Sequence, residues 1–314
     1  MDINDIKQVV VIGAGTMGHS IAQVYAQAEY SVNLVDLNQD ILDNALTKIK
    51  SNLSTLVEYG KIDQDVISKV MERIEISKDI SDSAKNADLV VEAVTEKPEV
   101  KESLFLKLSE ICSEKAIFAS NTSSLDVFKI AKKIKNLERL IIHHWFAPPH
   151  IIPLVEIVPG RKTSKNIIDL SIKIMEKLGK KAVLLNKFTE SFIVNKIQNA
   201  ISSVVFQLIL MKIASPKTID QAVKHSLGIR LPIVGVAQTL DFTGLDLVYD
   251  IAKNKGVEIG FIKDLLDNGH SGAKTSQGIY DYGSRSEDEI LKKRDLRYLQ
   301  NYDFLKKIDA FNPI

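Results

Sequence analysis

The sequence contains one cysteine and almost no excess of charge, and each scarcity excludes a class of protein. A single thiol, Cys112, cannot form an intramolecular disulfide or an all-cysteine metal site. The 314 residues include 41 Lys and Arg against 40 Asp and Glu, so the formal net charge is +1. A chain so close to neutral has no electrostatic footprint for nucleic acid or for an anionic membrane, and we expect neither as a partner.

Long apolar runs are also missing. The longest uncharged apolar-rich run, Ile197 to Met211, has 15 residues and includes Gln, Asn and Ser. A membrane-spanning helix needs about 20 predominantly apolar residues. The first seven residues are polar and acidic, unlike the basic start of a secretory signal. These features predict a cytoplasmic protein.

Short β-rich runs alternate with helical patterns over the first 188 residues. The runs lie at residues 8–12, 31–36, 74–76, 88–94, 116–120, 139–145, 154–158 and 181–186. This alternation predicts an α/β fold of the Rossmann type, with a doubly wound, mostly parallel sheet. Only helical patterns follow, the first from Ser191 to Ala214. We therefore predict two domains, residues 1–188 around the sheet and residues 189–314 all helical.

The first β-rich run leads into a turn of the G-x-G-x-x-G pattern. This turn consists of Gly13, Ala14, Gly15, Thr16, Met17 and Gly18. In such a turn the first glycine permits the bend, the second lets the backbone approach a pyrophosphate, and the third allows close packing of helix on strand. Asp36 ends the next β-rich run, where a carboxylate accepts hydrogen bonds from ribose hydroxyls. No arginine follows to receive a 2′-phosphate, so NAD is favoured over NADP; a plain glycine turn with a helix-capping aspartate is the alternative.

Two adjacent histidines end a later β-rich run. His143 and His144 precede the short run that contains Glu156. A histidine at the carboxyl edge of a parallel sheet can face the nicotinamide and take the hydroxyl proton of an alcohol while hydride leaves the carbon. A carboxylate on the other ring nitrogen would fix the tautomer and stabilise the imidazolium. From spacing alone, His144 and Glu156 are either such a pair or a half-buried histidine with a solvated glutamate.

Six segments together resemble the short-chain L-3-hydroxyacyl-CoA dehydrogenase family over essentially the whole chain. In family order they read VIGAGTMG, VVEAVTEKPEVK, ASNTSSL, HWFAPPHIIPLVEIV, ESFIVNKI and GAKTSQGIYDY. The resemblance implies an NAD-binding domain, a helical domain for substrate binding and dimerisation, and reversible oxidation of a 3-hydroxyacyl thioester of the kind met in fatty acid metabolism. It implies a homodimer that acts on a small molecule, acyl-CoA. We expect no metal, because His19, His225 and His270 lack Cys, Asp or Glu at metal-ligand spacing.

The resemblance also implies roles for individual residues. His144 matches the catalytic base, and Glu156 matches the carboxylate that orients it. Ser123 matches a serine that contacts both substrate and nicotinamide, and Asn195 matches an active-site asparagine of the first helix after the domain junction. The cofactor contacts of the family fall on Glu96 and Lys101.

Two departures from the family bear on the substrate. Ala147 stands where the family usually has an asparagine, three residues after the catalytic histidine. Near Tyr59, acyl-CoA members have a lysine for the CoA phosphates, and here only Lys61 could replace it. The PPHIIPLVE and GIRLP segments resemble a sister branch whose substrates carry no CoA. Alternatives are therefore a dehydrogenase of a free 3-hydroxy acid of the carnitine or L-gulonate type, or a non-catalytic, NAD-binding protein like lambda-crystallin.

Overall fold

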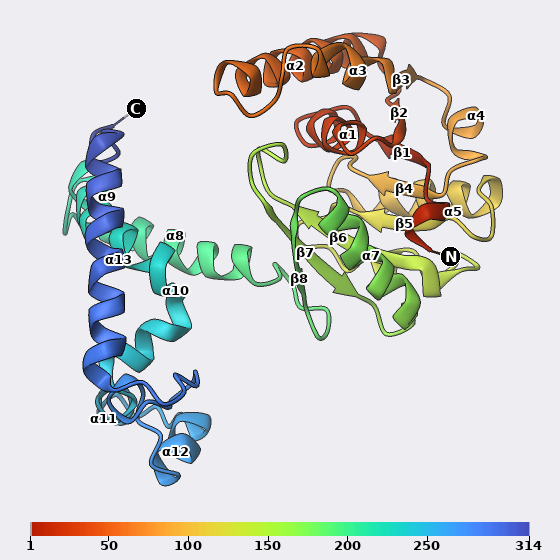
Figure 1. Cartoon of the computed structure of the whole chain (residues 1–314). Helices are drawn as coiled ribbons and strands as arrows, with labels where there is room; N and C mark the ends of the chain where they lie inside the picture. The colour runs from red at the N-terminus through yellow and green to blue at the C-terminus, as the bar shows by residue number, and fades with distance from the viewer. Residues whose placement is uncertain (1, 314) are drawn as a thin grey trace. The chain divides into compact units, whose positions relative to one another are not determined.

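The computed structural model describes residues 2–313, which form two compact units that divide between Ala200 and Ile201 (Figure 1). The first unit contains the sheet, and the second is built of helices. The predicted boundary at 188/189 lies before helix α8 (Val194–Leu210), and the units divide within that helix. Residues 1 and 314, the outer ends of the predicted domains, lie outside the described residues.

One sheet forms the centre of the first unit. In the described part of the chain its eight strands stand in the order β3, β2, β1, β4, β5, β6, β7, β8. Their bounds are β1 (Gln8–Ile12), β2 (Ser31–Val35), β3 (Ile74–Ser77), β4 (Leu89–Glu92), β5 (Ile117–Ser120), β6 (Leu140–Trp145), β7 (Leu154–Pro159) and β8 (Lys181–Leu184). All neighbours are parallel except β6 and β7. The predicted Rossmann-like, mostly parallel sheet followed by a helical region is confirmed.

Both faces of the sheet are covered by helices, which explains the continuous apolar runs. In β1, Val9 and Val11 belong to one hydrophobic cluster, and Val10 and Ile12 belong to another. The first cluster lies under α1 (Gly18–Gln27), α2 (Gln39–Glu58), α3 (Val66–Glu72) and α7 (Lys165–Lys177). The second lies under α4 (Ile80–Ala84), α5 (Pro98–Ile111) and α6 (Val127–Ile130).

Helix α8 is shorter than the sequence predicts. The helical pattern begins at Ser191, but Ser191 and Phe192 have φ of 62° and 51°, in the left-handed region that a right-handed helix cannot contain. At the other end Lys212 has φ 56°, which stops the predicted continuation to Ala214. The helix therefore begins at Val194, with its first amides directed at the end of the sheet.

The helical unit continues after α8 with five further α-helices in the described residues. They are α9 (Pro216–His225), α10 (Leu227–Thr243), α11 (Leu245–Asn254), α12 (Gly260–Asp267) and α13 (Glu287–Lys307). Short 3₁₀ turns lie at Ile3–Asp5, Leu137–Arg139 and Ala273–Thr275. Buried Asp241 of α10 accepts hydrogen bonds from the amides of Ile279 and Tyr280, 2.8 and 2.9 Å away, and so ties the GAKTSQGIYDY segment to that helix.

Within residues 2–313, no single helix is both long and apolar enough to cross a membrane. Helices α10 and α11 reach such a length and composition only when taken together, and they meet at a bend of 78°.

Candidate active site

The glycine turn lies between β1 and α1, and its three glycines have different surroundings. Gly13 has φ +99°, and a Cβ there would meet the carbonyl of Ala93. A Cβ on Gly18 would meet the carbonyl of Gly13, so this glycine is required by helix–strand packing. A Cβ on Gly15 would meet nothing within 4 Å, so the turn is open at that point. This open backbone, beside the helix amides that lack intrahelical acceptors, fits the pyrophosphate of a dinucleotide.

Asp36 stands directly after β2 and faces the same turn. Its Oδ2 accepts a hydrogen bond from the amide of Ala14 at 2.9 Å, and its Oδ1 accepts one from the amide of Asn38 at 3.2 Å. The carboxylate therefore shapes the glycine turn as well as standing where the sequence predicts a ribose contact.

His144 and Glu156 are paired across the antiparallel strands β6 and β7, where they are directly opposite in register. His144 Nδ1 is 2.7 Å from Glu156 Oε2, and both side chains are almost completely buried. An ionised carboxylate can only accept, so the ring proton is on Nδ1 and Nε2 is left with a free lone pair. The imidazole contacts the rings of Phe146 and Phe192, whose centres are 4.5 and 5.0 Å from its own.

The second oxygen of Glu156 is held by the start of α8. Oε1 accepts hydrogen bonds from the amides of Ile193 and Val194, each at 3.0 Å. A helix N-terminus favours negative charge, so this contact stabilises the ionised carboxylate. The two left-handed residues, Ser191 and Phe192, stand directly before these amides in the chain.

His143 points to the opposite face of β6. Its side chain is completely buried, and neither ring nitrogen has a hydrogen-bond partner among the described residues. Burial lowers the pKa of His143 to about 3, so the ring is neutral at any ordinary pH. The structure therefore separates the two histidines, and only His144 has a carboxylate partner.

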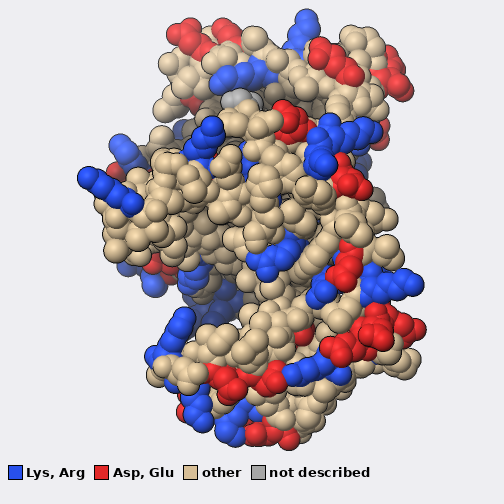
Figure 2. Space-filling model, turned by 90° about the vertical axis from the view of Figure 1, so that its left-hand side faces the viewer, with Lys and Arg blue, Asp and Glu red and all other residues tan. Residues whose placement is uncertain are grey.

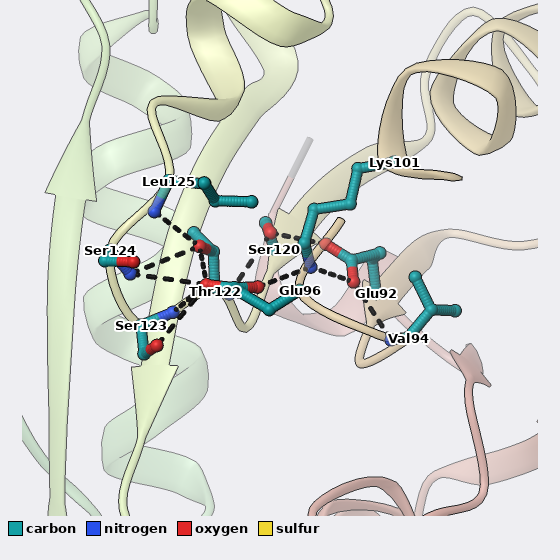
Figure 3. Close-up of polar contacts among 9 residues, drawn as sticks. All are labelled: Glu92, Val94, Glu96, Lys101, Ser120, Thr122, Ser123, Ser124 and Leu125. Carbon is teal, nitrogen blue, oxygen red and sulfur yellow. Dashed lines mark hydrogen bonds and ion pairs between the residues drawn. The ribbon is translucent and has the colours of Figure 1, made fainter. Parts of the chain in front are cut away.

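A second polar cluster lies at the carboxyl ends of β4 and β5 (Figure 3). Glu96 Oε1 accepts hydrogen bonds from the amide of Ser123 at 2.9 Å, from its hydroxyl at 3.3 Å and from the hydroxyl of Thr122 at 2.5 Å. Partial burial would raise the pKa of Glu96, but these bonds and the charge of Lys101 outweigh it and lower that pKa. The structure thus brings together Glu96, Ser123 and Lys101, which the sequence predicts separately.

Glu92, Ser120 and Thr122 belong to this cluster and are missed by sequence reasoning. Glu92 ends β4 and is completely buried, as is Ser120 at the end of β5. The available signal was a charged residue inside the otherwise apolar run from Leu89 to Val94, because a buried carboxylate needs a partner.

The two remaining predicted residues lie elsewhere. Asn195 is half-buried in the first turn of α8, next to the Val194 amide that binds Glu156. Lys61 is exposed beyond the end of α2, with its ammonium 5.8 Å from the ring centre of Tyr59. Among the described residues, no hydrogen bond or ion pair of Lys61 connects it to the other predicted site residues.

The loop between β6 and β7 is fastened on two sides. The His150 amide donates to Ser20 Oγ at 3.1 Å, and the His150 Nδ1 is 2.8 Å from the same oxygen. Lys180 donates to the carbonyls of Pro149 and Ile152 at 2.6 and 2.9 Å. Because Ser20 lies in the first turn of α1, the loop that follows His144 is joined to the helix that follows the glycine turn.

Surface charge is mixed where Figure 2 shows it, and the described residues contain no metal-ligand group. On the face shown in Figure 2, basic and acidic side chains are interspersed, and neither sign forms a continuous patch. Within residues 2–313, no three His, Cys, Asp or Glu side chains are grouped so that they could hold a metal ion.

Most of the chain matches the two domain models of one known protein family. Residues 8–188 match the model of the 3-hydroxyacyl-CoA dehydrogenase NAD-binding domain, and residues 192–282 match that of the C-terminal domain. The predicted cofactor, NAD, is thereby confirmed.

Individual relatives are similar over nearly the whole chain. A probable 3-hydroxybutyryl-CoA dehydrogenase of Bacillus subtilis is 32% identical over 290 residues, which are 90% of this chain and 99% of the relative. The 3-hydroxyadipyl-CoA dehydrogenase of Escherichia coli is 30% identical over 292 residues, 90% of this chain but 60% of that longer protein. The crystal structure of a 3-hydroxyacyl-CoA dehydrogenase from Archaeoglobus fulgidus aligns with a TM-score of 0.79 at 27% identity, covering 96% of this chain and 99% of that one.

Proposed function

The chain belongs to the 3-hydroxyacyl-CoA dehydrogenase family, and we propose that it reversibly oxidises an L-3-hydroxyacyl-CoA to the 3-oxoacyl-CoA. The observation that carries this proposal is the 2.7 Å pair of His144 and Glu156 on strands β6 and β7 of the NAD-binding domain. Bound NAD would supply the hydride acceptor for this reaction. The remaining tasks fall to residues of this chain.

His144 acts as the general base. Its Nε2 has a free lone pair, because the ring proton on Nδ1 is held by Glu156. In the oxidative direction Nε2 takes the proton of the 3-hydroxyl while hydride leaves the carbon that bears this hydroxyl. In the reductive direction the imidazolium returns that proton to the new alkoxide oxygen.

Glu156 orients the ring and stabilises its charged form. Its carboxylate accepts one hydrogen bond from His144 and two from the α8 amides, so it is fixed in place before the reaction. A negative charge fixed 2.7 Å from Nδ1 favours the imidazolium that forms during turnover.

Ser123 and Asn195 hold the substrate oxygen. The amide of Ser123 donates a hydrogen bond to Glu96, and this bond holds the backbone that carries the Ser123 hydroxyl in place after β5. Asn195 follows directly after the amides that hold Glu156, so α8 carries both an orienting contact for the base and a polar side chain. Two hydrogen bonds to the oxygen would place the reacting carbon and polarise the carbonyl.

The thioester is favoured over a free acid by the names of the relatives. The alignment with the probable 3-hydroxybutyryl-CoA dehydrogenase of B. subtilis covers 90% of this chain. The alignment with the 3-hydroxybutyryl-CoA dehydrogenase of Bradyrhizobium diazoefficiens covers 88%. Ala147 is the observation that favours the alternative, because it removes a polar group that the family usually has near the nicotinamide. A dehydrogenase of a free 3-hydroxy acid is therefore the second candidate.

The deciding experiment measures NADH oxidation with acetoacetyl-CoA and with free acetoacetate. We expect kcat/KM to be at least about tenfold higher for the thioester, which corresponds to about 1.4 kcal/mol of transition-state binding. Equal values would support the free-acid reading. Binding of NADH without turnover of either compound would indicate a non-catalytic protein.

A pair of variants tests the base. His144→Ala should lower kcat by about 10²–10⁴-fold, the usual cost of losing a general base. His143→Leu is the matched control, since it changes the adjacent residue on the opposite face of the strand and should retain turnover. If the control were the inactive variant, the assignment would be wrong by one residue.

We further propose that the protein is a homodimer joined through its helical domain. Val204, Phe206, Leu210, Met211 and Ile213, in and just after α8, have 54–80% of their surface exposed. So many large apolar side chains close together on one segment are typical of an interface. Sedimentation equilibrium should give a dimer, and Phe206→Glu with Leu210→Glu should give a folded monomer.

A further inference from the structure

A buried ion pair lies next to the proposed active site, and neither of its partners reaches solvent. Glu92 is 0% exposed and Lys101 is 1% exposed, and their Oε1 and Nζ atoms are 2.5 Å apart (Figure 3). A buried pair of this kind is weak evidence for stability, because removing two charges from water costs about as much as their attraction returns. Its geometry therefore points to another role.

Glu92 is connected to the loop that follows β4 and to the loop that follows β5. Its Oε1 also accepts the amide of Val94 at 3.0 Å, in the loop after β4. Its Oε2 accepts the hydroxyl of Ser120 at 2.5 Å, and Ser120 Oγ in turn accepts the amide of Thr122 at 3.3 Å, in the loop after β5. One buried carboxylate thus fixes the start of each loop.

Lys101 extends this arrangement to the surface. Its ammonium is shared between buried Glu92 and half-exposed Glu96, whose Oε2 is 3.1 Å away. The other oxygen of Glu96 holds the amide and hydroxyl of Ser123. The connected sequence is therefore Glu92, Lys101, Glu96, Ser123, from the core to the proposed substrate contact.

We propose that Glu92 is a positioning residue for Glu96 and Ser123 and acts through Lys101. It touches neither cofactor nor substrate, because it is completely enclosed. In place of the direct cofactor contact that the family resemblance implies, Lys101 takes an indirect part as well, because its side chain is only 1% exposed. It neutralises two carboxylates and keeps Glu96 directed at the Ser123 loop. This inference rests on the proposed roles of Ser123 and Glu96.

The first variant is Glu92→Gln, which keeps the size of the side chain but leaves only one oxygen that can accept hydrogen bonds. Its amide nitrogen cannot accept from Ser120, and Lys101 loses its buried counter-charge. We expect the melting temperature to fall, the Kd for NADH to rise severalfold, and kcat/KM for acetoacetyl-CoA to fall by about ten- to a hundredfold, a typical cost of misplacing a site.

The second variant separates positioning from stability. Glu92→Gln with Lys101→Met leaves no unpaired buried charge, so the melting temperature should return toward that of the wild type. The Kd for NADH and kcat/KM should stay impaired, because Glu96 has lost its cation. Recovery of both in the double variant would show that the pair is only structural and would overturn the proposal.

Two further comparisons complete the test. Ser123→Ala should cost less in the Glu92→Gln background than in the wild type, since Ser123 is already misplaced there; additive costs would contradict the proposal. Asp88→Asn is the matched control at the other end of β4, where the carboxylate accepts two amides at 2.9 Å. It should change the melting temperature without changing the Kd for NADH. If the wild type does not turn over acetoacetyl-CoA, the proposed function fails, while the NADH measurements still decide the role of Glu92.

Discussion

The stability of the sheet unit should depend on pH through His143, a residue that takes no part in the proposed chemistry. The ring is completely buried, and burial lowers its pKa from an ordinary value of 6.5 to about 3. Below pH 6.5 the His143 ring binds a proton in the unfolded chain but stays neutral in the folded chain. The free energy of unfolding is therefore highest above pH 6.5, decreases as the pH falls, and stops decreasing near pH 3, where the folded ring is protonated too.

The magnitude follows from the two pKa values. One pKa unit corresponds to about 1.4 kcal/mol, so lowering the pH from 7.5 to 5 should remove about 2 kcal/mol through His143 alone. Any folded-state pKa below about 4 gives the same figure, because the native ring then stays neutral at pH 5.

The assay compares wild type with His143→Leu by urea unfolding at pH 7.5 and at pH 5. Trp145, the single tryptophan, lies on the same strand and reports the unfolding of this unit by its fluorescence. Leucine removes two buried nitrogens without partners among the described residues, so the variant should be at least as stable at pH 7.5. Other titrating groups cancel in the comparison, and the wild type should lose about 2 kcal/mol more than the variant. Parallel losses would refute the reasoning.

Three further predictions concern the site. Glu156→Gln should direct an amide at His144 Nδ1 and move the ring proton to Nε2, which lowers kcat by about 10²–10⁴-fold; an unchanged kcat would remove Glu156 from the mechanism. Titration with NADH should show the same Kd for this variant as for the wild type. Asp36→Ala should raise KM for NAD and reduce the preference for NAD over NADP. Equal kcat/KM values for NAD and NADP in the wild type would contradict this. Lys61→Glu should raise KM for acetoacetyl-CoA severalfold, and the increase should be larger at low salt than at high salt. KM for NAD should stay unchanged. An unchanged KM for acetoacetyl-CoA at low salt would exclude Lys61 from CoA binding.

The fold could be predicted from local patterns because both faces of a doubly wound sheet are buried. Runs such as Gln8 to Ile12 are apolar throughout and too short for a helix, so each strand is visible from its own residues. The glycine turn was visible for the same reason, since its conformation is a property of the backbone at Gly13 to Gly18. Family resemblance then gave the residues of the site one at a time.

Their mutual arrangement depended on the tertiary structure. His144 lies opposite Glu156 in the register of β6 and β7, the one antiparallel pair among the described neighbouring strands. The left-handed Ser191 and Phe192 end a helical pattern early, so that two amides reach Glu156. Neither the direction of β7 nor the left-handed backbone at Ser191 and Phe192 can be recognised from the neighbouring residues in the sequence, because both are set by packing against distant elements.

The sequence by itself determined the class of fold and the cofactor, since these depend on short-range patterns of polarity and glycine, and its resemblance to a family identified the candidate residues. The family resemblance singled out His144, and the tertiary structure gave the physical difference: His144 pairs with Glu156, whereas His143 is buried with no partner among the described residues. The tertiary structure alone revealed Glu92. These decisions depend on burial and on hydrogen bonds between segments far apart in the chain, such as the one joining Glu92 to Ser120. The sequence gives only the type of a side chain such as a carboxylate or an imidazole. Its chemistry is set by the solvent, charges and hydrogen-bond donors that the fold places around it.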